Sequence, residues 1–172
     1  MEILQLMEKI IDIGKPSRVL QEEINILEVS SLWIELTYRY DVIEETQILL
    51  NHVKDVDLKL VMELGLKRLN KQINILENWM KDYAIPTPDR HRAAVNTVVK
   101  AEDVSDKYVF LRIFSGIQAF LNIHIEAFRQ APSPKIRKLF KDFLLEEVDI
   151  YDKIYEYGKL KNWISEPPVY RV

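Results

Sequence analysis

Apolar side chains recur every three or four residues over most of the chain, a spacing that places them on one face of an α-helix. The most regular stretch is 56–83, where they form one continuous stripe. The members of this stripe are Leu58, Met62, Gly65, Leu69, Ile73, Leu76, Met80 and Tyr83. The chain has only 4 glycines in 172 residues, which argues against a turn-rich β architecture. The sequence therefore predicts an all-α protein.

Breaks in this pattern divide the chain into helices. Four long helices are predicted, at 17–53, 56–83, 103–130 and 133–157. Ser17 and Ser133 are suited to cap two of them, and Gly158 is suited to end the last one. A short helix is predicted before them, at 1–14, and an extended C-terminal strap after them, at 158–172.

The connections predict how the helices are arranged. The short breaks at 54–55 and 131–132 each join two helices into an antiparallel hairpin. Residues 84–101, which include Pro86 and Pro88, cannot continue a helix and could span roughly 55 Å when extended. Two hairpins joined by one long crossover form the ferritin-like four-helix bundle. We therefore predict a single domain, 1–172, with this fold and an extra short N-terminal helix.

Charge and composition exclude several classes of partner. The net charge of −3 with interspersed signs gives no field for nucleic acid, and the absence of cysteine excludes disulfides and thiolate metal sites. Glu2 and Glu8 stand where a signal peptide would need a basic start, and no stretch approaches the ~18 apolar residues of a membrane span. We expect a cytoplasmic protein with no signal peptide, no membrane span and no nucleic acid.

Ferritin-like oxidases hold two iron or manganese ions with carboxylates from all four helices, including a Glu-x-x-His pair on two of them. In this chain the residue three positions before each histidine is Leu49, Pro88 or Leu121. The chain therefore lacks the pair, and we expect no cofactor. If a metal binds, Fe or Mn is the expected choice.

Two groups of residues remain candidates for a variant metal site, because each group falls near one level of the bundle when counted from the turns. The first group is Glu28, Glu77 and His124. The second group is Asp41, Glu45 and Glu147. The alternative for the first group is a core histidine with satisfied hydrogen bonds, and for the second a buried ion-pair network with Arg112. Both alternatives stay open.

Several motifs resemble those of one known family. They are Leu32-Trp33 with Arg39-Tyr40-Asp41, Leu76-Glu77 with Tyr83-Ala84-Ile85-Pro86, Gly116 to Leu121, and Gly158 to Trp163 with Pro167-Pro168. From about Ser17 onward the chain resembles an uncharacterised ferritin-like family of spore-forming bacteria, related to spore coat protein F. Many members carry this unit twice, and this chain carries it once. The resemblance implies the ferritin-like fold, a coat-like or stress-related role and a spore-associated location, but no assigned chemistry.

These observations favour a non-catalytic protein with a structural or interaction role, so we assign no catalytic or cofactor-binding residues. The apolar surface of 17–53 is wider than one bundle seam needs, which predicts a homodimer or coat-type protein partners. The first alternative is a divergent di-metal carboxylate oxidoreductase or metal-storage protein. A second is a binder of small apolar ligands in a gap near Gly65 and Gly116, which would require an enclosed cavity lined by aromatics.

Overall fold

The computed structural model describes residues 15–90 and 104–168, which contain five helices and no strand. These helices are α2 (Ser17–Gln21), α3 (Ile26–Leu50), α4 (Val56–Asp82), α5 (Asp106–Gln130) and α6 (Pro134–Leu160). The all-α prediction is confirmed for this part of the chain. The helix predicted at 1–14, residues 91–101 of the predicted crossover and the last four residues of the strap lie outside the described residues.

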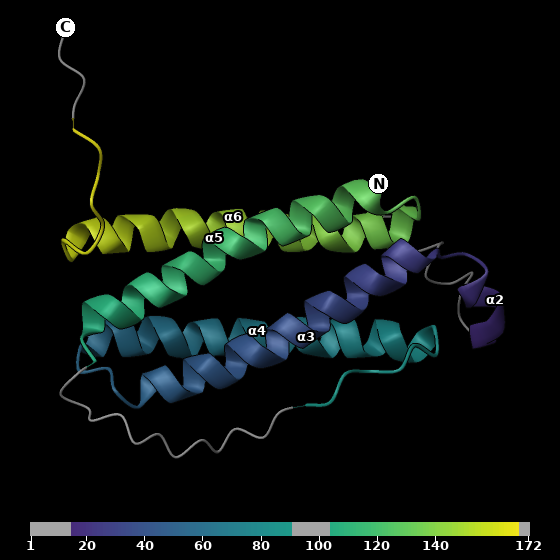
Figure 1. Ribbon diagram of the computed structural model, residues 1–172, viewed down its shortest axis with the longest axis horizontal. Helices are drawn as coiled ribbons and strands as arrows, with labels where there is room; N and C mark the ends of the chain where they lie inside the picture. Colours follow the sequence, from purple (N-terminus) through teal and green to yellow (C-terminus); the bar gives the residue numbers. More distant parts are fainter. Residues whose placement is uncertain (1–14, 91–103, 169–172) are drawn as a thin grey trace, which may run out of the picture.

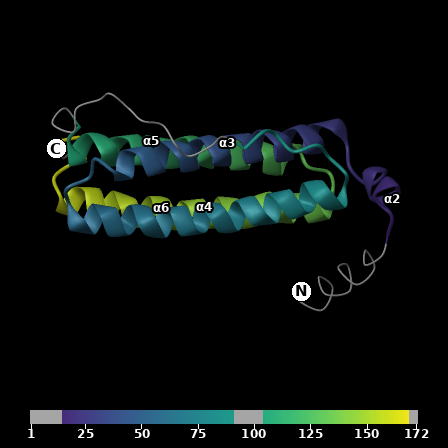
Figure 2. The same cartoon turned by 90° about the horizontal axis from the view of Figure 1, so that it is seen from below.

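The four long helices, α3 to α6, run side by side in two layers (Figures 1 and 2). One layer holds α3 and α5, and the other holds α4 and α6 (Figure 2). The most extensive packing lies within the α5–α6 hairpin, followed by the α3–α4 hairpin, as their short connections predict. The short helix α2 lies at the end of the bundle where α3 begins (Figure 1).

The single helix predicted at 17–53 is two helices in the structure, α2 and α3. The Asn25 side chain accepts hydrogen bonds from the backbone N–H groups of Leu27 (2.8 Å) and Glu28 (3.0 Å). The Glu28 carboxylate in turn accepts one from the Asn25 backbone N–H (3.0 Å). This capping box satisfies the free N–H groups of a new helix start, so the chain begins α3 here instead of continuing α2.

Gly158 does not end the last helix, which continues to Leu160. The left-handed residue that follows the helix is Asn162, with a φ of 56°. Gly158 is instead buried where the C-terminal segment folds back, and a Cβ there would lie 2.7 Å from Ile164 Cδ1 and overlap the Phe110 ring. Trp163 packs against that ring at 5.4 Å between centroids, so the start of the predicted strap is held by an aromatic contact.

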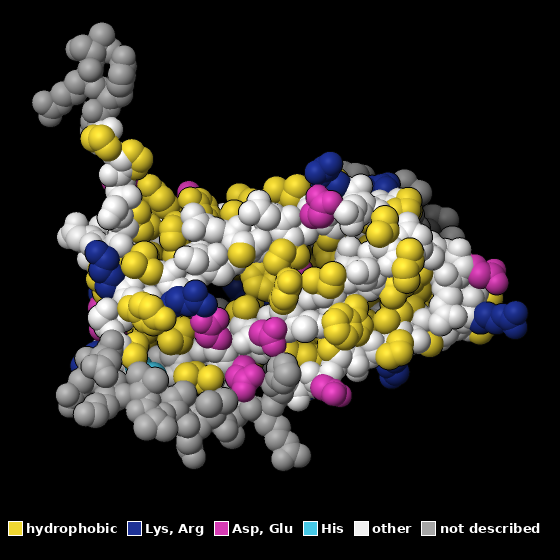
Figure 3. Space-filling model, in the orientation of Figure 1, with side chains coloured by type: hydrophobic (Ala, Val, Ile, Leu, Met, Phe, Trp, Pro, Cys, Tyr) yellow, Lys and Arg dark blue, Asp and Glu magenta, His cyan; other side chains and the backbone are white. Residues whose placement is uncertain are grey.

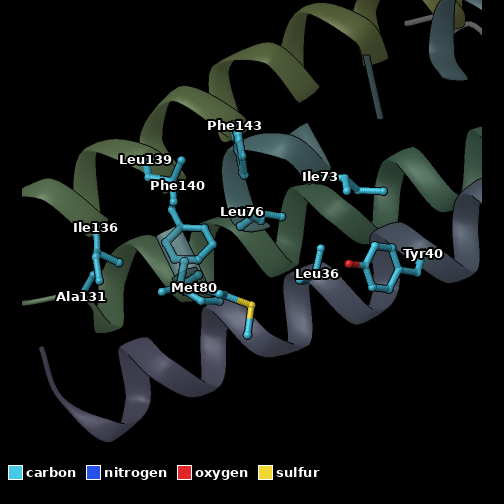
Figure 4. Packing of buried hydrophobic residues seen from close by; sticks show 12 residues of the cluster. Leu36, Tyr40, Ile73, Leu76, Met80, Ala131, Ile136, Leu139, Phe140 and Phe143 are labelled. Atoms are coloured by element: carbon cyan, nitrogen blue, oxygen red, sulfur yellow. The ribbon is translucent and has the colours of Figure 1, made fainter. Parts of the chain in front are cut away.

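Two hydrophobic clusters fill the bundle, one toward each end. The cluster near the α5–α6 turn includes Leu36, Ile73 and Phe140, which come from α3, α4 and α6 and point toward one another (Figure 4). The cluster near the other end includes Leu58 and Phe110. All five of these side chains are fully buried, so the helices are held together by apolar contacts at two levels of the bundle.

One helix of the described residues, α5, is long and apolar enough to cross a membrane, whereas the sequence was expected to contain no such stretch. It contains an 18-residue window with a mean hydropathy of 1.3 and is long enough to cross a membrane, by length and composition only. The core helix of a soluble protein meets the same criterion, although only 28% of this window is buried in the bundle. The composition of α5 is therefore weak evidence for a membrane span.

Two tyrosines make the stability of the bundle sensitive to alkaline pH. Burial and a hydrogen bond to Glu77 hold the pKa of Tyr40 well above its usual range, and burial and the negative charge of Asp55 raise the pKa of Tyr157 to about 12. In the unfolded chain a tyrosine titrates near pH ~10. The folded state keeps these protons longer, so their contribution is complete below pH ~10 and is lost as the pH rises through the folded-state pKa.

We expect the free energy of unfolding to fall as the pH rises above ~10, and to fall less in Tyr157→Phe. Urea unfolding on both sides of that pH measures the difference. The control is Tyr108→Phe, at an exposed tyrosine of α5. An equal fall in the wild type and in Tyr157→Phe would show that Tyr157 does not contribute to the alkaline sensitivity.

Candidate functional site

A buried charged cluster lies between the two hydrophobic clusters. It consists of Glu35 and Arg39 of α3, His124 of α5 and Glu147 of α6, each at most 3% exposed. Arg39 Nε donates a hydrogen bond to Glu35 Oε1 (2.9 Å), and Arg39 Nη2 lies 3.0 Å from His124 Nε2 and 3.7 Å from Glu147 Oε2. The guanidinium of Arg39 therefore connects three helices.

The arginine also determines the tautomer of His124. A guanidinium has no acceptor, so His124 Nε2 accepts from Arg39 and the imidazole carries its proton on Nδ1. That Nδ1 lies 3.5 Å from Glu35 Oε2, and neither atom has a hydrogen-bond partner among residues 15–90 and 104–168. The Arg39 guanidinium also lies 3.9 Å from the centre of the Phe120 ring, a cation–π contact in a desolvated position.

This arrangement does not fit a pair of metal ions. Glu35, His124 and Glu147 are suitable ligand types, but all three are directed at Arg39. Its positive charge takes the central position and would repel a dication. Within residues 15–90 and 104–168, no three His, Asp or Glu side chains are grouped in a way that could hold a metal ion.

The structure does not bring the first predicted group together. Glu28 Oε1 accepts a hydrogen bond from the Ser133 backbone N–H (2.8 Å), so Glu28 ties the start of α3 to the α5–α6 turn. Glu77 accepts one from the Tyr40 hydroxyl (2.7 Å). Only His124 belongs to the buried charged cluster. Each carboxylate is thus used by a different structural contact.

The second predicted group is also divided. Glu147 lies in the buried charged cluster, whereas Asp41 is exposed and Glu45 pairs with Arg112 at 2.8 Å. The expected ion pair with Arg112 exists, but both partners are about half exposed. The arginine that faces the buried carboxylates is Arg39.

Sequence reasoning missed Glu35 and Arg39, although a signal was present. Positions 28, 32, 35, 39, 42 and 46 of α3 alternate steps of four and three, the spacing of one helix face. An apolar side chain alone is not evidence of a core position in this helix, because Trp33 is 42% exposed. Charged residues at core spacing were the evidence for a buried polar layer.

A cavity of about 440 Å³ adjoins the cluster, and all four long helices line it. Two members of the charged cluster, Arg39 and Glu147, line this cavity, and Gln72 of α4 lines it as well. Gly65 and Gly116 lie on its wall, where the sequence predicted a gap. The face formed by α3 and α5 is hollowed, with basic, acidic and hydrophobic side chains around the hollow (Figure 3).

The cavity lining is more aliphatic than predicted. Its apolar wall is mostly leucine, valine and isoleucine, including Ile113, Ile117, Ile150 and Ile154, and within the part of the chain that the structure describes only two aromatic residues line it. These are Phe120 and Tyr157. An aliphatic, partly open space with a charged end suits a flexible chain better than a flat ring.

Comparison with known proteins identifies the family. Residues 15–172 match the family described as "Protein of unknown function (DUF3231)". The chain belongs to this family. A solved structure of a protein described as a "putative spore coat protein" from Bacillus halodurans C-125 superposes with a TM-score of 0.76 at 20% sequence identity. The match covers 87% of this DUF3231 chain and 96% of that chain, and at this identity it shows the fold alone. No curated protein matches the chain.

Proposed function

We propose that this DUF3231 protein is a ferritin-like bundle with a structural or interaction role, and that it has no redox metal centre. The observation that carries the proposal is the buried guanidinium of Arg39, held among Glu35, His124 and Glu147 in the bundle core. Ferritin-like oxidases place their metals between facing helices in the same kind of position. A fixed positive charge there opposes metal binding and leaves the carboxylates with a partner already.

The proposed ferritin-like arrangement is supported by the connections between the helices. Two hairpins with short turns, and a long connection between them, are the features of that topology. A relation to spore coat protein F, and a spore-associated location, are supported by the fold shared with the Bacillus halodurans protein. We propose this setting for the chain on that basis.

The proposed partners are a second copy of the chain or other coat-type proteins. The outer surface of α3 supports this, because Leu27, Ile34 and Tyr38 are each at least 40% exposed. Large apolar side chains gathered on one helix are typical of surfaces that are covered in an assembly.

Titration with Fe(II) and Mn(II) tests the proposal. The wild type, purified without a tag or chelator, should bind no stoichiometric metal at micromolar concentration, and Mn(II) should not raise its melting temperature. In Arg39→Ser the guanidinium that stands between Glu35, His124 and Glu147 is gone, so these three side chains can close around an ion and Mn(II) should raise the melting temperature of this variant. Arg112→Ser is the matched control, because it removes an exposed arginine from an ion pair outside the charged cluster.

The result that contradicts the proposal is equally defined. Wild-type protein that binds about two ions per chain, with loss of that binding in Glu147→Ala, would make the protein a divergent di-metal oxidoreductase or metal store. The wild-type measurement decides the question even if Arg39→Ser is unstable.

A further inference from the structure

The cavity beside the charged cluster has the size and wall of a ligand site. Its volume of about 440 Å³ lies within the ~300–1,000 Å³ range of small-molecule sites. On α3 its lining extends from Arg39 to Leu49, which corresponds to about 15 Å along the helix. The space is therefore elongated, and because its wall is mainly aliphatic it is also apolar.

Two glycines keep this space open. Gly65 and Gly116 lie inside helices α4 and α5, where glycine is destabilising relative to alanine. A Cβ at either position would meet no atom of the described residues within 4 Å, so packing among these residues does not require glycine at either position. Gly158 differs, because there a Cβ would overlap its neighbours. The two cavity glycines therefore leave volume that residues 15–90 and 104–168 do not fill.

The charges that line the cavity favour an anionic ligand. Five cationic and two anionic side chains line it, and both carboxylates, Glu45 and Glu147, already have arginine partners. The remaining cations, Lys67, Arg68 and Lys153, are exposed and have no ion pair within the part of the chain that the structure describes. A negative head group would find unpaired positive charge at these three residues.

We propose that the cavity binds a single-chain anionic amphiphile of the fatty-acid kind. The alkyl chain occupies the aliphatic space along Gly65 and Gly116, and the carboxylate lies near Lys67, Arg68 and Lys153. Arg39 does not bind the head group, because Glu35 and Glu147 already surround it with negative charge. This site needs no metal and goes beyond the structural role proposed above.

Calorimetric titration with sodium dodecanoate, below its micelle concentration, tests this inference. We expect saturable binding of about one molecule per chain, with affinity rising roughly threefold for each methylene from hexanoate to dodecanoate. Dodecyltrimethylammonium, which has the same chain and the opposite charge, should bind at least roughly tenfold more weakly. No binding of dodecanoate to the wild type would overturn the inference.

Variants at the wall and at the cations locate the site. Gly116→Leu places a side chain in the cavity and should abolish binding, whereas Ala119→Leu creates the same side chain at an exposed position of α5 and should not. Arg68→Glu with Lys153→Glu should weaken dodecanoate binding roughly tenfold, and the exposed Lys71→Glu should leave it unchanged.

The smaller substitution Gly116→Ala keeps the test valid if Gly116→Leu does not fold. It should weaken binding while raising the melting temperature, because alanine favours the helix and removes volume. Equal binding in the wild type, Gly116→Ala and any folded Gly116→Leu would show that the ligand does not occupy this cavity. Equal binding of the cationic amphiphile would show that the rim charges do not select the head group.

Discussion

Replacing Arg39 with methionine should lower the free energy of unfolding by about 3–5 kcal/mol. Methionine keeps much of the length of the side chain but removes the charge. Glu35 and Glu147 would then be left buried without their cationic partner, and His124 Nε2 would lose its donor. The cost arises from these uncompensated buried groups, since a carboxylate in an apolar interior is strongly destabilised. Urea unfolding of the two proteins at neutral pH measures it.

Two further variants separate this effect from a general loss of arginine. Arg112→Met breaks an ion pair with Glu45 that is about half exposed, so it should cost less than about 1 kcal/mol. Adding Glu35→Gln and Glu147→Gln to Arg39→Met removes both stranded charges and should restore part of the loss. A loss in Arg39→Met no larger than in Arg112→Met would show that the buried cluster is not required for stability.

Gly158→Ala should destabilise the protein by about 1–3 kcal/mol, although alanine favours helices. Gly158 is buried inside α6, and the added Cβ would lie 2.7 Å from Ile164 Cδ1 and overlap the Phe110 ring. Relief requires moving the C-terminal segment or a fully buried phenylalanine of the core. Thermal and urea unfolding of the variant give the sign and size of the change.

The same substitution at the other two helical glycines of the bundle is the internal control. Gly65→Ala and Gly116→Ala should each stabilise by up to about 1 kcal/mol, because the new Cβ meets nothing within 4 Å. A loss of stability at all three positions would mean that helix packing is closer around Gly65 and Gly116 than the structure shows.

Much of the fold could be predicted from local patterns. The regular spacing in α4 and the short turn at 131–133 define helices whose ends differ from the prediction by a few residues at most. The errors occurred where a local signal had two meanings. Asn25 and Glu28 were a helix start inside an apparently continuous helix, and Gly158 reflected close packing instead of a helix end.

The site was harder to predict because it depends on how distant helices align. An error of a few residues in each helix end shifts the level assigned to every side chain. Glu28 was placed level with His124, but it contacts Ser133, beyond the end of α5. The residues of α3 that do meet His124 are Glu35 and Arg39, about two and about three turns further along that helix. Only the folded chain reveals this alignment.

The buried charged cluster also restricts how the two hairpins can slide past each other. The hydrophobic clusters on either side of it consist of similar apolar side chains, so a shift by one heptad along the bundle axis would still bury apolar surface. The same shift would move Arg39 away from His124 and Glu147 and leave three polar groups facing hydrocarbon. We expect Arg39 to select one alignment of the two hairpins, because its contacts with α5 and α6 form in that alignment alone. Bundles with a shifted alignment would be disfavoured during folding.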